Sequence, residues 1–314
     1  HMLQTIGPDS PRQKRCAQEQ ARQTTAVAET DVSRLMTVDD DIAVDEVGIR
    51  TARFRDFRIK SAFQSIWRHR DGLLLPRAVE GLARVFRDGA PVPPLEFFAQ
   101  VAAEDRYSVE CLCRALHLHN YHNIGIPGVD MFFNYDPRVN GNLDQSVRQL
   151  GYMADRLEQI GVDIRLLVCE ITETDVLDRD AFVRLTAEIR RLGMRLAIDD
   201  FGAGHSTLGR VRTVEPEFVK FDGAFFRRVV EEPAALRLLR QLADGFKADG
   251  AMVIFEGLET PTQLVAAIET GADYLQGYLL GRPALAGSIF DAKPKPIEYF
   301  TGPSDRIVRL HPGR

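Results

Sequence analysis

The sequence predicts an α/β barrel in which eight strands alternate with amphipathic helices. Short β-like runs recur through the central part of the chain, and helical patterns such as those at 143–161 and 234–250 separate most of them. Glycine follows several of these patterns where helices commonly end, as at Gly161, Gly193 and Gly250. The expected strands are 57–67, 77–85, 128–135, 164–172, 194–200, 217–222, 251–257 and 272–278.

The main alternative for this pattern is a doubly wound open sheet. Such a sheet would carry a GxGxxG phosphate-binding turn after its first strand, and the sequence contains no such motif. The barrel is therefore the better interpretation.

Composition divides the chain into three parts. Residues 1–50 are polar and poor in aromatic side chains, so we expect a lead-in that is partly helical or disordered. Residues 51–290 hold the strand and helix patterns and form the expected barrel domain. Residues 291–314 contain four prolines and predict an irregular tail.

The bulk properties exclude some classes of protein. The formal net charge of −5 gives no basic surface for duplex nucleic acid. The chain lacks a run of eighteen apolar residues, so we expect a soluble, cytoplasmic chain without a membrane segment. No CxxC pair is present, and we expect the cysteines to be scattered, mostly buried small side chains in a reducing compartment. They are Cys16, Cys111, Cys113 and Cys169.

Polar side chains occur at the carboxyl ends of most of the expected strands. In an α/β barrel these ends meet at one rim, where the chemistry takes place. Taken singly, an acid at such a place is commonly a helix N-cap or a solvated loop residue. Glu170 and Lys220 differ, because each lies inside an apolar run and a buried charge needs a partner or a metal. The rim residues are Glu80, Asn134, Glu170, Glu173, Asp199, Asp200, Lys220, Asp222, Glu256, Glu259 and Gln276.

The acids and the amide at this rim favour a site for hard divalent cations. Carboxylate and amide oxygens suit Mg²⁺ or Mn²⁺ better than zinc. Two such ions could share Asp199, with Asp200 on the second ion, if the backbone twists at the strand end. Gly202 and Gly204 would permit that turn. The three histidines of HLHNYHN (117–123) do not align on one helix face, so we interpret this stretch as a solvated helix end.

Seven short motifs follow one another along the chain. Glu80-Gly81-Leu82 comes first, with Arg84 shortly after it. The others are NYDP from Asn134, EITE from Glu170, DDFGAGHSTL from Asp199, VKFD around Lys220, EGLET from Glu256 and QGY from Gln276. In this order they resemble the EAL domain family of cyclic di-GMP phosphodiesterases, over roughly residues 52 to 290. A lone DDFG would be weak evidence, whereas the complete series is highly specific.

The resemblance implies a TIM-like (β/α)8 barrel whose first strand runs antiparallel to the others. It implies hydrolysis of cyclic di-GMP to linear pGpG, with two Mg²⁺ or Mn²⁺ ions in each site. Because calcium prefers larger and looser coordination, we expect Ca²⁺ to inhibit. The metal ligands that the resemblance implies are Glu80, Asn134, Glu170, Asp199 and Asp200.

The resemblance also implies roles for other rim residues. Lys220 would contact the attacking water, and Glu256, near the second ion, would act as general base or would position that water. Asp200 would be the third catalytic residue. Glu259 and Gln276 would support the metal ligands from behind.

A further set of residues would bind the substrate or order a loop. Arg84 would contact a substrate phosphate, although a surface salt bridge explains an arginine there equally well. Glu173 would anchor the loop after Asp200, which the family uses in metal binding and dimer contact. The substrate-binding residues implied in this way are Gln64, Leu82, Arg84 and Asp222.

Four positions depart from the family's motifs. Gly81 replaces alanine, Asp136 replaces serine, Ala203 replaces threonine and His205 replaces tyrosine. None of these changes removes a ligand, so the sequence favours an active enzyme. The alternatives are a catalytically inactive cyclic-di-GMP receptor or interaction module, and a barrel hydrolase for another phosphate ester. The expected partners are cyclic di-GMP, a second copy in a homodimer, and an upstream regulatory domain or protein.

Overall fold

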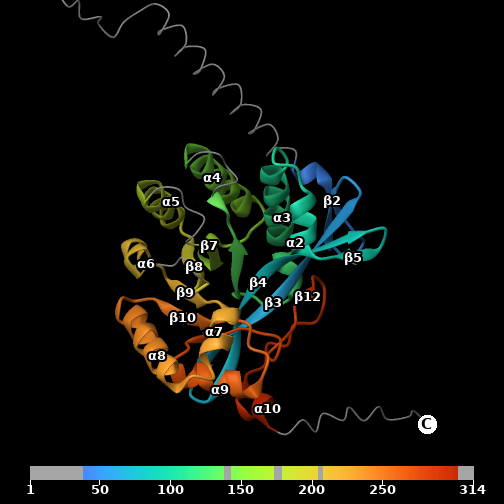
Figure 1. Cartoon of the computed structure of the whole chain (residues 1–314). Helices are drawn as coiled ribbons and strands as arrows, with labels where there is room; N and C mark the ends of the chain where they lie inside the picture. The colour runs from blue at the N-terminus through green and yellow to red at the C-terminus, as the bar shows by residue number, and fades with distance from the viewer. Residues whose placement is uncertain (1–37, 138–142, 173–178, 204–207, 303–314) are drawn as a thin grey trace, which may run out of the picture.

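A closed barrel of eight strands forms the centre of the chain, and helices surround it (Figure 1). The structure is a computed structural model, which describes residues 38–137, 143–172, 179–203 and 208–302. The barrel strands are β3 (Phe57–Arg70), β4 (Leu73–Arg87), β6 (Asp130–Asn134), β7 (Leu167–Thr172), β8 (Arg195–Phe201), β9 (Phe218–Phe221), β10 (Met252–Phe255) and β11 (Tyr274–Leu275). Strand β3 runs antiparallel to both of its neighbours, β4 and β11, and the remaining pairs are parallel. The predicted TIM-like barrel with an antiparallel first strand is confirmed.

The first two barrel strands are longer than the sequence analysis expected, and the last is shorter. Asp71 and Gly72 join β3 to β4 with φ values of 52° and 74°. An Asp-Gly pair suits a two-residue hairpin turn with two positive φ values, so both strands continue up to it. Strand β11 ends at Leu275: the Gln276 N–H still donates to the Phe255 carbonyl of β10 at 2.9 Å, but the Gln276 carbonyl accepts from the Leu258 N–H, beyond β10, at 3.1 Å.

Most helices lie outside the barrel and cover its strands (Figure 1). Gly161, Gly193 and Gly250 follow helical segments with φ values of 71°, 96° and 94°, which confirms the predicted stop signals. These helices are α4 (Leu143–Gln159), α5 (Arg179–Arg191), α6 (Leu208–Val214), α7 (Gly223–Val229), α8 (Pro233–Ala248) and α9 (Pro261–Thr270).

The β3–β4 ribbon extends beyond the barrel and carries a second apolar cluster under two helices. On one side it pairs with β2 (Arg50–Phe54), and on the other with β5 (Ala90–Val92). Helices α2 (Pro94–Gln100) and α3 (Arg106–Asn120) lie beside this extension (Figure 1). Phe97 of α2 is fully buried there, with its ring centroid 4.9 Å from that of Phe57.

The described ends of the chain contain short elements. The segment expected as a lead-in contains the 3-10 helix η1 (Val38–Asp41) and β1 (Ile42–Val44), which pairs with β2. Near the other end are β12 (Ala284–Leu285), β13 (Lys295–Pro296) and α10 (Glu298–Thr301). No helix within the described ranges has the length and apolarity that crossing a bilayer requires.

Candidate functional site

The pleat of the barrel strands brings the polar residues of the rim together. Eight buried apolar side chains, one from each barrel strand, form a cluster of their own. Side chains two residues apart lie on the same face of a strand, so the next inward position toward the rim carries a polar residue. In β3, which is antiparallel, that position lies two residues earlier. The pairs are Ile66–Gln64, Ala78–Glu80, Phe132–Asn134, Val168–Glu170, Ala197–Asp199, Phe218–Lys220, Ile254–Glu256 and Tyr274–Gln276.

Lys220 of β9 lies at the centre of this polar layer. Its side chain is 1% exposed, and its Nζ is 3.2 Å from Asp199 Oδ1 and 3.9 Å from Glu80 Oε2. It also forms ion pairs with Glu170 and Glu256. A charge buried this deeply is stable only with such partners. The ammonium of β9 thus pairs with acids from β4, β7 and β8 and with Glu256, which follows β10.

A β-bulge brings two adjacent acids to the same centre. In the β8–β9 pairing Ile198 is opposite Val219 and Phe201 is opposite Phe221, so Asp199 and Asp200 together oppose only Lys220. Asp200 has a φ of +56°, a left-handed conformation that costs about 1–2 kcal/mol for a residue with a Cβ. The extra residue turns both carboxylates toward the site, and an oxygen of each lies within 4.8 Å of a Glu256 oxygen.

Negative charge exceeds positive charge in this layer. Glu80, Glu170, Asp199, Asp200 and Glu256 would carry −5 when ionised against +1 on Lys220, a net −4. Burial raises the pKa of Glu170 and of Glu256 well above their ordinary value, with Lys220 opposing the shift. Burial and then Asp199 raise the pKa of Asp200 to about 6. Burial lowers the pKa of Lys220, but the surrounding acids outweigh it and hold that pKa well above the usual value.

The carboxylates meet the requirements of a divalent-cation site. Glu80, Glu170 and Glu256 bring one oxygen each to within 4.8 Å of one another, and so do Asp199, Asp200 and Glu256. One buried oxygen each of Glu170, Asp199 and Glu256 faces the Lys220 ammonium, and the second Glu170 oxygen is buried without a hydrogen-bond donor among the described residues. Hard oxygens that carry excess negative charge suit Mg²⁺ or Mn²⁺. Glu256 belongs to both groups, whereas the sequence analysis expects Asp199 to be shared.

Two amides hold Glu80 in place, and a third contacts one of them. Gln276 Nε2 donates to Glu80 Oε2 at 2.7 Å, and Asn134 Nδ2 donates to Glu80 Oε1 at 3.3 Å. Gln276 also donates to Gln64 Oε1 at 3.3 Å, and Gln64 donates to the Gly281 carbonyl at 3.0 Å. Gln276 thus lies behind a carboxylate of the cluster and donates to it.

Other residues named from the sequence lie apart from the cluster. Glu259 is exposed and pairs with Arg227 at 3.8 Å. Asp222 caps helix α7, where its Oδ1 accepts from the Phe225 N–H at 2.6 Å. Glu173 lies outside the described residues.

A cleft of about 340 Å³ lies between the rim and helices α2 and α3. Arg84 and Leu82 line it together with Asn134 and Asp136, so two of the expected substrate-binding residues face the same space as an expected metal ligand. Arg84 Nη1 donates to the Ala83 carbonyl at 3.0 Å, which directs the guanidinium along the cleft wall.

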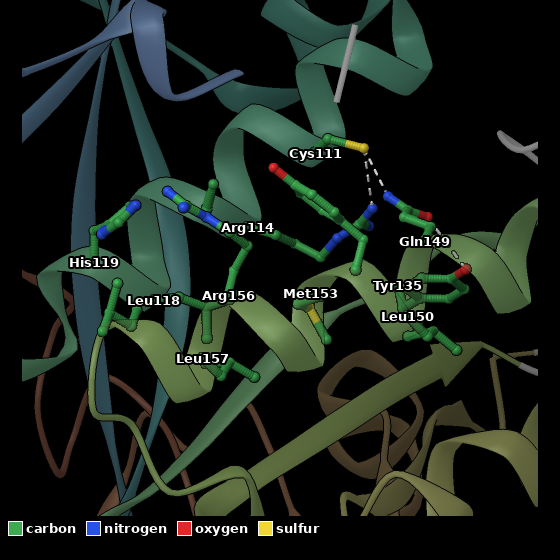
Figure 2. A pocket seen from close by; sticks show the side chains of 13 residues that line it. Cys111, Arg114, Leu118, His119, Tyr135, Gln149, Leu150, Met153, Arg156 and Leu157 are labelled. Atoms are coloured by element: carbon green, nitrogen blue, oxygen red, sulfur yellow. Dashed lines mark hydrogen bonds between the residues drawn. The ribbon is translucent and has the colours of Figure 1, made fainter. Parts of the chain in front are cut away.

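The residue after Asn134 anchors the end of β6 to helix α4. Tyr135 is buried, and its hydroxyl donates to Gln149 Oε1 at 3.3 Å. Arg114 of α3 lies with its guanidinium 4.8 Å from the centre of the Tyr135 ring. Figure 2 shows these side chains converging with Cys111, whose sulfur accepts from Gln149 at 2.6 Å. The surrounding cavity of about 60 Å³ separates α3 from α4.

The interpretation of HLHNYHN as a solvated helix end is wrong for its first histidine. His117 is 5% exposed, and Ser61 Oγ lies 2.9 Å from its Nδ1. Burial, and then Arg114, lower the pKa of His117 to about 3. Arg114 was missed altogether, although an arginine inside the apolar run CLCRALHL was a signal of the same kind as Glu170. Among the described cysteines, Cys111, Cys113 and Cys169 are free and buried, as predicted.

Comparisons with known proteins agree with this geometry. The family model for the EAL domain matches residues 49–283. The chain is 28% identical over 212 residues to the probable cyclic di-GMP phosphodiesterase PdeA of Escherichia coli, covering 65% of this chain and 28% of PdeA. It is 30% identical over 118 residues to the cyclic di-GMP phosphodiesterase PdeF of the same organism, covering 37% and 16%. The chain therefore spans less than a third of the length of these relatives.

Solved structures agree in fold. BlrP1 of Klebsiella pneumoniae, in complex with manganese and cyclic di-GMP at pH 6, aligns with a TM-score of 0.64 at 27% identity. That alignment covers 76% of this chain and 59% of BlrP1. YkuI of Bacillus subtilis, which has an EAL domain, aligns with a TM-score of 0.65 at 22% identity and covers 74% and 57%; this likeness concerns the fold alone. Since the family model matches well over half of the 314 residues, the chain belongs to the EAL domain family.

Proposed function

We propose that this chain is a cyclic-di-GMP phosphodiesterase that hydrolyses cyclic di-GMP to linear pGpG with two divalent cations. The observation that carries the proposal is the pair of carboxylate triads that share Glu256 around Lys220. The names of PdeA and PdeF, and the manganese and cyclic di-GMP bound to BlrP1, support it.

The carboxylates divide naturally between two cations. Glu80 and Glu170 would hold one ion, together with the side-chain oxygen of Asn134, and Asp199 and Asp200 would hold the other. Bound Mg²⁺ or Mn²⁺ would neutralise charge on the phosphate and make the attacking water more acidic. Ca²⁺ would support little turnover, because its larger and looser coordination misplaces the reacting groups.

The chain's own side chains would orient the reactants. Lys220 is held by its ion pairs with Glu170 and Glu256, so its ammonium is fixed where it can donate to the water or to a phosphate oxygen. Glu256 has a buried oxygen that pairs with Lys220, and a raised pKa suits this carboxylate to accept the proton of the water. Arg84, at the wall of the cleft, would bind the second phosphate with its planar guanidinium.

The test is metal-dependent turnover of cyclic di-GMP, followed by anion-exchange separation of the nucleotides. We expect linear pGpG with Mg²⁺ or Mn²⁺, and none with EDTA. Asp199→Ala should abolish turnover with the fold intact, as circular dichroism would verify. Asp249→Asn is the matched control, because Asp249 pairs with Arg212 beyond the opposite end of the barrel. A folded Asp199→Ala variant with near-normal turnover would contradict the proposal, and wild-type binding without turnover would instead indicate a receptor.

We also propose that the chain acts in the cytoplasm as a homodimer, under control of an upstream domain or partner protein. Turnover per chain that rises with protein concentration, together with a dimer in sedimentation, would support the homodimer as the active form. Equal turnover per chain in monomer and dimer would contradict it.

A further inference from the structure

The space behind the metal ligand Glu80 is filled in an unusual way. Glu80 points into the barrel, so Gly81 faces outward toward helix α3. A Cβ at position 81 would lie 3.2 Å from His117 Cγ, 3.3 Å from His117 Cβ and 3.1 Å from Met131 Cε. Such distances are shorter than ordinary carbon contacts, so the imidazole occupies the room that a larger residue at 81 would need.

Hydrogen bonds fix His117 in this position. Its Nδ1 lies 2.9 Å from Ser61 Oγ, and Ser61 belongs to β3, the strand that pairs with β4. Asn120 donates to the same hydroxyl at 3.2 Å and is itself fully buried. The Asn120 amide both accepts from the Arg50 N–H and donates to the Arg50 carbonyl, at 2.9 Å each. Because Asn120 and Arg50 in turn hold Ser61, the ring cannot swing away from β4 without losing its bond to a fixed hydroxyl.

The Glu80 carboxylate is sensitive to small shifts of its backbone. Its two oxygens accept from Gln276 at 2.7 Å and from Asn134 at 3.3 Å. A movement of β4 by a few tenths of an ångström would change both distances and the position of Glu80 in its carboxylate triad.

We propose that His117 is a positioning residue for Glu80: it fills the space beside Gly81 from α3 and so holds β4 where Glu80 lies at metal-binding distance. The inference depends on the proposed cation site and extends it to a residue outside that site. It also explains why glycine stands at position 81, since an alanine Cβ there would displace the His117 ring by a few tenths of an ångström.

Four variants separate this role from simple packing. His117→Asn keeps the Cβ and Cγ atoms that fill the space beside Gly81, and it places an amide where Nδ1 meets Ser61. His117→Ala removes the Cγ and the hydrogen bond. Gly81→Ala adds a Cβ that meets the His117 Cγ at 3.2 Å, and the double variant Gly81→Ala/His117→Ala removes that Cγ, so the added methyl group occupies part of the space that the ring leaves. His119→Ala is the matched control on the same helix, because His119 lines the α3–α4 cavity instead.

The readout is Mn²⁺ affinity by titration calorimetry, at a temperature where circular dichroism shows each variant folded. We expect His117→Ala and Gly81→Ala each to weaken Mn²⁺ binding by about tenfold, as losses of supporting contacts do. His117→Asn, His119→Ala and the double variant should stay within about threefold of wild type, the double variant through a non-additive interaction of contacting residues.

Each outcome bears on the inference without needing turnover. Wild-type affinity in folded His117→Ala, or a double variant as weak as the sum of its single changes, would overturn it. Mn²⁺ binding by wild type without hydrolysis of cyclic di-GMP would refute the proposed function but leave this inference standing on the affinities. If the wild-type chain binds no Mn²⁺, both fail.

Discussion

Removing the ammonium at the centre of the site should destabilise the chain strongly. Lys220→Met keeps most of the length and apolar volume of the side chain but removes its charge. At an effective dielectric of about 20, an ion pair at 3.2 Å is worth about 5 kcal/mol and one at 3.9 Å about 4 kcal/mol, before desolvation is subtracted. Burial of the ammonium offsets most of this sum, and breaking a buried pair typically costs about 3–5 kcal/mol. We expect Lys220→Met to lose about that much free energy of unfolding in EDTA at pH 8.

The loss should depend on pH and on metal. The pKa of Glu170 and of Glu256 is raised in the folded chain, so these groups take up protons as the pH falls and their repulsion decreases. The cost of Lys220→Met should therefore be smaller at pH 5.5 than at pH 8, and Mn²⁺ should recover part of it.

The assay is urea unfolding followed by circular dichroism, with Lys247→Met as the control. Lys247 is 37% exposed and pairs with Asp273 at 3.3 Å on the surface, so its loss should cost less than about 1 kcal/mol. If Lys220→Met and Lys247→Met unfold at the same urea concentration in EDTA at pH 8, the ammonium does not stabilise the cluster and the reasoning is refuted.

Three further predictions concern single residues. Burial lowers the pKa of His117 to about 3, so below pH 6.5 the unfolded chain binds a proton that the folded chain does not. The free energy of unfolding of wild type should therefore fall by about 1.4 kcal/mol per pH unit relative to that of His117→Asn. Urea unfolding between pH 6.5 and pH 5 measures this difference. An equal slope in both chains would contradict this. Since burial raises the pKa of Glu170, Glu170→Gln should be at least as stable as wild type in EDTA at pH 8. Its melting temperature should nevertheless rise less with Mn²⁺ than that of wild type. A rise in melting temperature equal to that of wild type would exclude Glu170 as a ligand. Gly277→Ala places a Cβ 2.1 Å from the Leu258 carbonyl oxygen, and it should lower the free energy of unfolding by more than about 3 kcal/mol. Gly245→Ala lies inside α8 with open space around the added Cβ, and it should raise that free energy by about 0.5–1 kcal/mol. Similar melting temperatures for the two glycine variants would show that the turn at 277 adapts.

The sequence alone predicts the barrel and most of the central cluster, because both depend on local periodicity. An apolar residue followed two positions later by a charged or amide side chain recurs in strand after strand, as in Val168 and Glu170 or Phe218 and Lys220. In a closed barrel that repetition is enough to place these side chains in one layer.

Features that depend on tertiary contacts could not be obtained in the same way. In the motif EGLET, both Glu256 and Glu259 are expected at the rim. Strand β10 ends at Phe255, however, and Glu259 lies beside Arg227 on the surface. His117 resembles its neighbour His119 in sequence, and only the approach of α3 to Gly81 decides which of the two is buried. Such outcomes depend on which helix packs where, and a single sequence does not encode them in a short pattern.

The extra residue at Asp199 and Asp200 also changes the face of the strand on which the following side chains lie. Without it, Phe201 would point into the barrel two positions after Asp199, beside the carboxylate cluster. With it, the Phe201 ring faces outward, 5.1 Å from Phe246 of α8 and 5.4 Å from Phe221. One added residue thus places the two acids in the polar cluster and the next aromatic ring in the apolar layer under the helices. Deleting it would exchange the two environments, so this strand tolerates no change in length at that point.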